Sequence, residues 1–259
     1  MYKRLLLVML LITAQTICNA QYFKKNNWNY FEGKLGAKNI RLAFYFEGYG
    51  AVKGTFAYPN STVKIPFSGI INSKEADFIV TENGKQTGTI TARLITGDTD
   101  IIEGKYYAGT DQNNPSDFKV TLVDYCAGTP EKMYPVFKAP DDEADQFMQL
   151  AIKSILADDK AWVMNHISFP LLWWSNADWS SNSVDKEDLQ QTYAQVFSSR
   201  FKERLKTAYV VNLSHGQFGV ILGNRENGLI TVLYDTDPKT GAEKFVITSL
   251  DCPDEEQRK

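Results

Sequence analysis

Cysteine and histidine are scarce in this chain of 259 residues, which contains three cysteines and two histidines. Cys18 lies beside an apolar N-terminal run, so only Cys126 and Cys252 remain in the rest of the chain. Zinc sites need Cys or His ligands at characteristic spacings, and these widely separated residues match none of them. The sequence therefore predicts no metal site, and it contains no motif that indicates a cofactor.

Clusters of basic charge are also missing. Phosphate binding requires grouped Lys or Arg side chains, yet residues 21–140 carry 14 basic and 12 acidic residues. Residues 141–259 carry 12 basic and 19 acidic residues, so the second half of the chain is acidic. We therefore expect no nucleic-acid partner. The acidic half is compatible with an inhibitor or immunity-type protein that neutralises a partner by charge complementarity.

Long apolar runs are absent except at the N-terminus. Lys3 and Arg4 precede an apolar run over residues 5–12. The small residues that follow are suited to signal-peptide cleavage between Ala20 and Gln21. The run is shorter than the roughly 20 residues that a membrane-spanning helix needs. The sequence thus predicts a signal peptide at residues 1–20, no membrane span, and an exported, soluble protein that is periplasmic or secreted.

Export permits a disulfide, and Cys126 and Cys252 each follow a predicted strand. A bond between them would close a loop of about 126 residues and stabilise the fold by ~4–5 kcal/mol on the chain-entropy account. The sequence does not show whether the two Cβ atoms lie close enough to be bridged. A disulfide and two separate thiols therefore remain alternative interpretations.

Residues 21–126 show a β pattern with little helical periodicity. Gly54, Gly69, Gly88 and Gly104 each fall inside a predicted strand. Glycine within a strand indicates a bulge, a bend or the close approach of another backbone. Its recurrence predicts an all-β antiparallel meander that curls into an open barrel or twisted sheet. The pattern is similar in general terms to glycine-punctuated β-meander modules of exported bacterial proteins, which implies binding or scaffolding. The predicted strands cover residues 40–46, 52–58, 63–70, 77–80, 86–94, 101–107 and 118–123.

Three prolines at Pro130, Pro135 and Pro140 predict a linker over residues 127–140. Apolar residues then recur at helical spacing, which predicts an α+β domain over residues 141–252 and a polar tail at 253–259. The predicted helices begin near residues 141, 159 and 185, with Pro170 ending the second and the third continuing to about residue 206. The predicted strands cover residues 209–213, 217–222, 229–234 and 244–250.

The second half resembles the nuclear-transport-factor-2-like family, whose fold is a cystatin-like α+β cone. The resemblance rests on Trp162, the segment Ile167-Ser168-Phe169-Pro170-Leu171, the helix at 189–205 and the strand pair at 217–224 and 229–232. It covers residues 141–252 and not the meander. It implies a curved sheet wrapped around helices, with a conical cavity. Some family members are isomerases or dehydratases, and others are binding or dimerisation modules, so the fold does not decide the function. A homodimer through the C-terminal sheet is one expected assembly.

The resemblance also implies where chemistry would occur. Catalytic members of the family use a carboxylate or a His–Asp pair, often with a tyrosine, to move a proton beside a carbonyl group. The candidates here are His166, Asp178 and Tyr193, with Asp145 as a further carboxylate. The alternative for His166 is a helix-end histidine that bonds to the backbone or to solvent, and the sequence favours this alternative.

Tryptophan is concentrated in residues 162–174. We predict a ligand site at Trp162, Trp173, Trp174, Phe197 and Phe218, because tryptophan combines a large apolar surface with an N–H donor. Core packing is the alternative role for these side chains. The predicted function is an exported, non-catalytic two-domain protein that binds an unidentified protein or a small apolar, aromatic-stacking ligand. The alternative is a small lyase, isomerase or hydrolase that uses His166 and Asp178.

Overall fold

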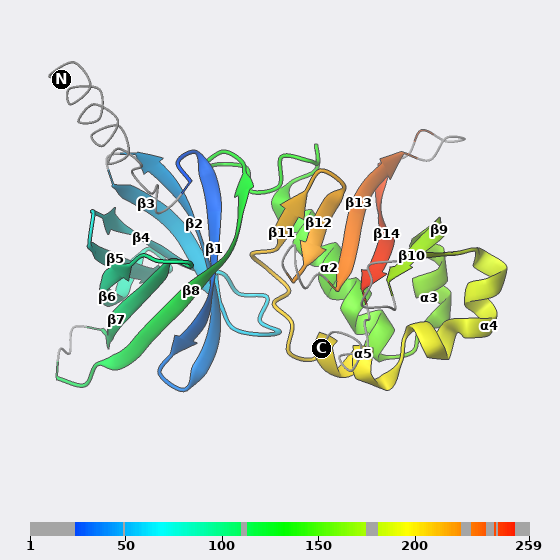
Figure 1. Ribbon diagram of the computed structural model, residues 1–259, viewed down its shortest axis with the longest axis horizontal. Coiled ribbons are helices and arrows are strands. Elements are labelled where there is room, and N and C mark those ends of the chain that lie inside the picture. The colour runs from blue at the N-terminus through cyan, green and yellow to red at the C-terminus, as the bar shows by residue number, and fades with distance from the viewer. Residues whose placement is uncertain are drawn as a thin grey trace, which may run out of the picture.

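The structure is a computed structural model that describes residues 24–48, 50–109, 113–174, 181–223, 229–236, 241 and 243–251. A barrel and a sheet with helices follow one another along the chain and lie side by side (Figure 1). In these ranges, no helix has the length and apolar content needed to cross a membrane. The predicted signal peptide lies outside the described residues.

The N-terminal domain is a closed barrel of eight antiparallel strands. The all-β prediction is confirmed, whereas the expectation of an open barrel or sheet is wrong. The difference is β1, which was not among the predicted strands and which pairs with β2 on one side and with β8 on the other. The strands are β1 (Asn27–Leu35), β2 (Lys38–Gly48), β3 (Ala51–Ala57), β4 (Ile65–Ile71), β5 (Glu75–Glu82), β6 (Lys85–Ile95), β7 (Ile101–Ala108) and β8 (Ser116–Ala127).

Phenylalanine side chains fill the barrel. The rings of Phe31 and Phe44 stack with their centroids 5.3 Å apart, and those of Phe67 and Phe78 lie 5.1 Å apart. All four side chains are buried. A barrel of eight strands encloses a space just wide enough for side chains. The interior is therefore a hydrophobic core.

The strand glycines lie where neighbouring strands come close together. A Cβ atom at Gly54 would lie 2.1 Å from the carbonyl oxygen of Ala43, and the corresponding distances at Gly69 and Gly104 are 2.0 and 2.2 Å from backbone oxygens. At Gly88 the nearest group is the side chain of Tyr106. Three of these four glycines thus permit the close backbone approach that a small, strongly coiled barrel requires.

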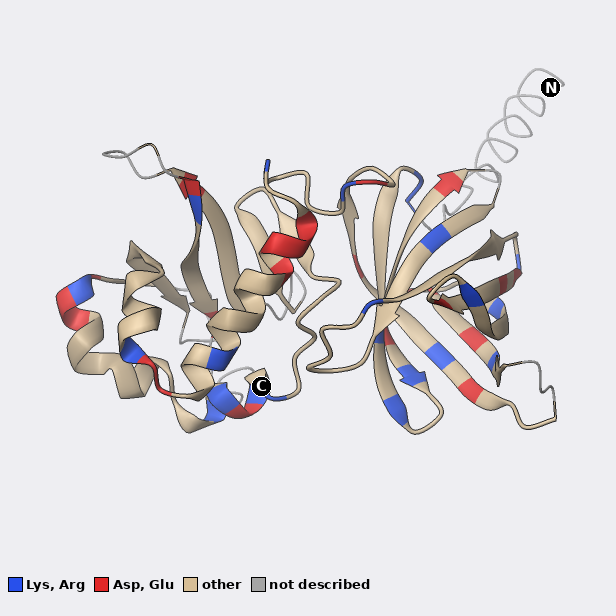
Figure 2. Cartoon of the chain, turned by 180° about the vertical axis from the view of Figure 1, so that it is seen from behind, with Lys and Arg blue, Asp and Glu red and all other residues tan. Residues whose placement is uncertain are grey.

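The C-terminal domain is a six-stranded mixed sheet with helices, which confirms the α+β prediction. The strand order is β10-β9-β14-β13-β12-β11, and β14 pairs with β9 in parallel. Helix α2 crosses one face of this sheet (Figures 1 and 2). The elements are α2 (Asp141–Leu156), α3 (Lys160–Asn165), β9 (Ile167–Trp174), β10 (Ser181–Val184), α4 (Lys186–Val196), α5 (Ser199–Leu205), β11 (Ser214–Gly216), β12 (Gly219–Leu222), β13 (Ile230–Thr236) and β14 (Glu243–Asp251).

Two helix predictions are corrected by the structure. The predicted helix from residue 185 to 206 is two helices, because the backbone leaves the helical conformation at Phe197 and a new helix begins at Ser199. The Ser198 hydroxyl accepts a hydrogen bond from the backbone N–H of Phe201 at 3.3 Å, as expected of a serine N-cap. Pro170 does not end a helix, because α3 ends at Asn165 and Pro170 lies within β9.

The strand predicted at residues 209–213 is an irregular segment. Its backbone groups bond to side chains instead of to a neighbouring strand. The carbonyl oxygen of Asn212 accepts a hydrogen bond from Arg41 Nε at 2.7 Å, and the Leu213 N–H donates to the Tyr134 hydroxyl at 2.9 Å. Because buried backbone groups need partners, these side chains take the place of a sheet ladder.

The two domains share one hydrophobic core. Trp28, Tyr30 and Tyr45 project from the outer wall of the barrel into the same cluster as Met148 of α2 and Phe201 of α5. The core of the C-terminal domain therefore extends onto the outer surface of β1 and β2. Burial of this apolar surface holds the two domains in one fixed arrangement.

Arg41 joins the domains at the centre of this interface, where its side chain is 1% exposed. Besides the bond to Asn212, its guanidinium donates to the Ser214 hydroxyl at 2.7 Å and pairs with Glu32 Oε1 at 2.5 Å. The same guanidinium lies 5.3 Å from the centre of the Tyr30 ring. A buried guanidinium is tolerated when its donors are satisfied in this way.

Replacement of Gly54 by alanine should destabilise the barrel, because the new Cβ atom overlaps the Ala43 carbonyl group. We expect the free energy of unfolding to fall by about 1–3 kcal/mol, as measured by denaturant unfolding. Gly97→Ala is the control, because no atom lies within 4 Å of its Cβ position. Its effect should stay within about 0.5 kcal/mol. Equal stability of the two variants would contradict the role given to close backbone approach.

The Arg41→Leu variant should lose about 3–5 kcal/mol of stability, because it leaves buried polar partners unpaired. Scanning calorimetry should show a lower melting temperature or a separate transition for each domain. The control is Arg93→Leu, which removes an arginine that is 70% exposed and pairs with Glu103. That change should leave the melting temperature close to that of wild type, because an exposed ion pair is screened by solvent. If both variants melt alike, Arg41 does not hold the domains together.

Candidate functional site

His166 takes part in an aromatic stack. Its ring centroid lies 3.9 Å from that of Trp162, with the ring planes 16° apart, and Phe147 lies 5.8 Å away. Its Nδ1 atom lies 2.7 Å from the carbonyl oxygen of Trp162. Within the part of the chain that the structure describes, no carboxylate bonds to His166. The geometry is that of a helix-end histidine held by the backbone.

The other candidate acid–base residues lie elsewhere. Tyr193 is on α4 and lines a pocket against α3. Asp145 is on α2, at the junction of the two domains. Asp178 lies outside the described residues. The structure therefore brings neither Tyr193 nor Asp145 into contact with His166.

The predicted ligand-binding aromatic residues are dispersed over the C-terminal domain. Trp162 belongs to the aromatic stack of α3, while Trp173 and Trp174 are half-buried on β9. Phe197 is buried in the core between α4 and α5, and Phe218 is 72% exposed in the turn between β11 and β12. These five side chains do not surround one site.

Cys126 is buried at the end of β8, with its sulfur atom 3.0 Å from the carbonyl oxygen of His215. The His215 imidazole Nε2 lies 2.6 Å from the carbonyl oxygen of Ala127. Both contacts join the barrel to β11 of the sheet. Cys252 lies outside the described residues, so the disulfide stays a prediction.

A groove of about 840 Å³ lies at the junction of the two domains. One wall is the outer face of α2 and the other is the loop between β3 and β4. Its lining combines apolar side chains with uncharged polar ones, and includes Thr62, Gln146, Gln149, Leu150, Leu156 and Val210. Leu150 is 50% exposed, which is unusual for a leucine on a helix that packs against a core.

Asn60 ties the loop wall of the groove to the C-terminal domain. Its backbone N–H donates to the carbonyl oxygen of Ala208 at 3.0 Å, and its side-chain amide donates to the carbonyl oxygen of Lys206. Both acceptors follow α5 in the chain. These bonds hold the loop wall in place against the C-terminal domain.

A charged network centred on the buried Asp145 lies beside the groove. Lys64, in the same loop as Thr62, places its Nζ atom 2.5 Å from Asp145 Oδ2 and 3.2 Å from Asp142 Oδ1. The Tyr134 hydroxyl donates to Asp145 Oδ1 at 2.8 Å. Because that hydroxyl also accepts from the Leu213 N–H, the network connects the barrel, α2, the linker and the segment before β11.

Burial raises the pKa of Asp145 above its ordinary value, although the Lys64 ammonium favours the charged carboxylate. Burial by itself would lower the pKa of Lys64, but Asp145 and Asp142 raise the pKa of that ammonium overall. Burial, reinforced by Asp145, raises the pKa of Tyr134 well above its ordinary value. Lys64 therefore stays positively charged and Tyr134 stays a hydrogen-bond donor at neutral pH.

Lys64, Tyr134 and the groove residues were not among the predicted site residues. Lys64 fell within a predicted strand and Tyr134 within the predicted linker, so no local pattern distinguished either residue. The spacing of Gln146, Gln149 and Lys153 was the one available signal, because steps of three and four residues place polar side chains on one exposed helix face.

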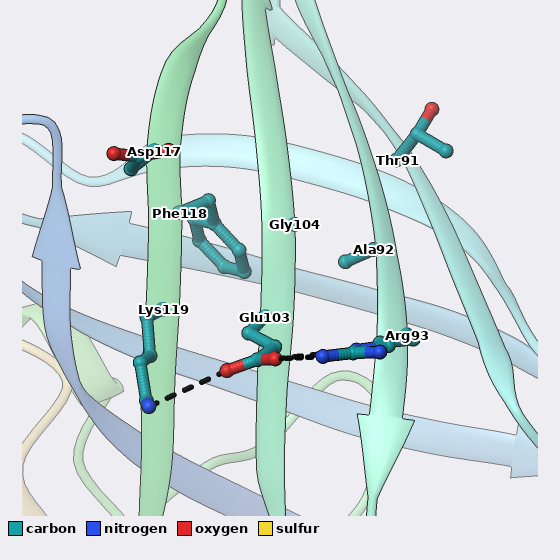
Figure 3. A pocket seen from close by; sticks show the side chains of 8 residues that line it. All are labelled: Thr91, Ala92, Arg93, Glu103, Gly104, Asp117, Phe118 and Lys119. Carbon is teal, nitrogen blue, oxygen red and sulfur yellow. Dashed lines mark hydrogen bonds and ion pairs between the residues drawn. The ribbon is translucent and has the colours of Figure 1, made fainter.

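A second depression, of about 570 Å³, lies on the outer face of the barrel across β6, β7 and β8 (Figure 3). Glu103 lies between Arg93 at 2.5 Å and Lys119 at 3.3 Å. Basic and acidic residues alternate along this face of the barrel (Figure 2). Solvent-exposed pairs of this kind contribute little to stability, because water screens them. This depression is therefore part of the hydrated outer surface of the barrel. The groove between the domains is the stronger candidate site.

Comparison of the chain with protein-family models, with curated proteins and with solved structures finds no match. A closed eight-stranded β-barrel is followed by an α+β domain with a mixed six-stranded sheet, and a groove lies at their junction.

The Lys64→Met variant should lose about 3 kcal/mol of stability near pH 8, because Asp145 is then a buried carboxylate without a cation. Removal of Lys64 raises the pKa of Asp145 further in the folded state than in the unfolded chain. The folded state then favours the protonated acid, so the loss should shrink as the pH falls from about 8 to about 4. Denaturant unfolding at several pH values measures this change.

The Lys64→Met/Asp145→Asn double variant is the control for this effect. It removes the charge from both partners, so it should recover most of the stability that the single variant loses near pH 8. A loss that is independent of pH, or a double variant no more stable than the single one, would show that the ion pair is not the cause.

Proposed function

We propose that this chain is an exported, non-catalytic binding protein whose ligand lies in the groove between the barrel and the α+β domain. The observation that supports this most directly is a preformed groove between two domains that Arg41, Asn60 and Lys64 hold together. Ligand sites occur preferentially at domain junctions and are mostly formed before the ligand arrives.

The lining of the groove suits an uncharged, partly apolar ligand. Leu150 and Val210 supply apolar surface, and Gln146 and Gln149 supply amide donors and acceptors. Lys153 is the one charged side chain among the lining residues. An extended peptide segment has this alternation of apolar side chains and neutral hydrogen-bonding groups. The ligand class we propose is therefore a neutral peptide segment of a partner protein.

The order of elements supports the further proposal that the second domain is a cone of the nuclear-transport-factor-2-like type. Two helices precede the β9–β10 hairpin, and two more precede the β11–β14 meander, whose last strand pairs with β9. Phe147, Phe197 and Phe245 belong to the core of this domain, between its helices and its sheet. We therefore place the ligand in the external groove and not in a conical cavity.

The catalytic alternative receives less support from the described residues. A general base must lie within hydrogen-bonding reach of the proton that it takes. The His166 Nδ1 atom is engaged by the Trp162 carbonyl group, and its ring stacks on the Trp162 indole. The proposal therefore assigns His166 a structural role at the end of α3.

The groove can be tested with N-phenyl-1-naphthylamine, an uncharged fluorophore that brightens in apolar surroundings. The mature protein should bind the probe saturably at one site. Leu150→Ser should weaken binding about tenfold, since burial of a leucine side chain contributes about 1.5–3 kcal/mol. Phe218→Ser is the matched control, because Phe218 is more exposed than Leu150 and does not line the groove. Its affinity should remain within about twofold of wild type.

An equal loss of affinity in the Leu150→Ser and Phe218→Ser variants would show that the probe binds outside the groove. Competition by a capped neutral peptide library tests the ligand class. Displacement of the probe by neutral peptides supports the proposal, and the absence of displacement overturns the peptide assignment.

A further inference from the structure

Four polar side chains gather at one end of the barrel. Because neighbouring strands are antiparallel, β3, β5 and β7 all end there and β2 begins there. Lys38 is the first residue of β2, Tyr58 directly follows β3, Glu82 is the last residue of β5, and Tyr106 lies near the end of β7. We call these four residues the barrel-end cluster. None of them lines the interdomain groove.

Packing against the barrel core positions the two tyrosine rings. The Tyr58 ring meets the buried Phe56 ring edge-on, with the centroids 6.1 Å apart, and Tyr106 packs against the same core. A Cβ atom at Gly88 would lie 2.5 Å from the Tyr106 ring, so the ring occupies space that any larger residue at position 88 would fill. Both rings are therefore held in place by apolar contacts.

The polar groups of the cluster face solvent. Among the described residues, neither the Tyr58 nor the Tyr106 hydroxyl forms a hydrogen bond, and neither is one of the buried polar atoms that lack a partner. Since both side chains are only half-buried, their hydroxyl groups are accessible. Glu82 is exposed and, within the same ranges, forms no ion pair. These groups are thus available to a ligand.

The four groups are close enough to interact. Burial raises the pKa of Tyr106 above its ordinary value, and nearby Tyr58 and Glu82 raise it further. Burial, followed by Glu82, also raises the pKa of Tyr58. The Lys38 Nζ atom lies 5.2 Å from the centre of the Tyr58 ring. The cluster thus presents two hydroxyls, a carboxylate and an ammonium around two aromatic rings.

We propose that the barrel-end cluster binds a carbohydrate through one sugar ring. A carboxylate only accepts hydrogen bonds, an ammonium only donates them, and a tyrosine hydroxyl does both. Sugar hydroxyls also do both, so one sugar ring can satisfy all three kinds of group, while its apolar face packs on a tyrosine ring. Lys38 would repel an organic cation, and Glu82 would repel an anion. The cluster therefore favours a neutral ligand that is rich in hydroxyl groups.

Saturation-transfer NMR on the mature protein tests this proposal with the methyl β-glycosides of glucose, galactose, mannose and N-acetylglucosamine. At least one glycoside should bind saturably at millimolar concentrations. Its affinity should not depend on salt, because the ligand is uncharged. Cyclohexylamine and cyclohexanecarboxylate contain a ring of the same size with a single charge, and each should bind at least about tenfold more weakly than that glycoside.

Glu82→Gln should lower the affinity for the bound glycoside about fivefold, because a neutral amide replaces a charged acceptor. Glu75→Gln is the matched control, since Glu75 is an exposed glutamate at the other end of the same strand. The control should bind the glycoside like wild type. Leu150→Ser, in the groove, should also leave the affinity unchanged, so the two binding proposals succeed or fail separately.

Tyr58→Phe/Tyr106→Phe keeps both rings and removes only the two hydroxyls. Affinity for the glycoside should fall about tenfold. Without sugar, the melting temperature should stay close to that of wild type, because neither hydroxyl is bonded within the described part of the folded chain. A folding defect would lower both quantities. Tyr125→Phe is the control, because Tyr125 lies at the opposite end of the barrel with Lys24 3.8 Å from its ring centre.

Three outcomes would overturn the proposal. The first is no saturable binding of any of the four glycosides. The second is binding of either charged ring compound that equals or exceeds that of the best glycoside. The third is glycoside binding that is unchanged in both the Glu82→Gln variant and the double tyrosine variant, which would place the sugar elsewhere on the protein.

Discussion

Arg41 is buried between the barrel wall and the segment before β11, where its hydrogen bonds hold the two domains together. Its guanidinium is satisfied by groups from both domains, Glu32 on one side and Asn212 and Ser214 on the other. Such a group is stable inside a protein only while all its partners are in place. The domains are therefore held in one arrangement, and the groove whose walls they supply has a fixed shape.

The same interface explains why the first strand is difficult to recognise in the sequence. The segment from Trp28 to Phe31 is buried at every position, because its inner face lies in the barrel and its outer face lies against the α+β domain. The alternation of apolar and polar residues that marks a half-exposed strand is consequently missing. Buried Asn29 within this run obscures the pattern further. Without β1 the predicted meander has no partner for β8, and so it could not be predicted to close.

The C-terminal domain divides its surfaces between packing and recognition. The inner faces of its helices, including those with Phe147 and Tyr193, fill the space over the sheet. The outer face of α2 forms one wall of the groove. The groove beside α2 is largely neutral, whereas the pocket between α3 and α4 carries two lysines.

The glycine-punctuated strands, the start of α2 at Asp141 and the all-β and α+β halves could be predicted from the sequence alone. These features depend on residues a few positions apart, whose spacing and turn chemistry can be read directly. The closed barrel, the irregular segment before β11 and the candidate groove become visible only in the folded chain. Each depends on contacts such as that between Arg41 and Asn212, which are separated by 171 positions. A pattern of neighbouring residues carries no information about which distant groups will satisfy a buried charge.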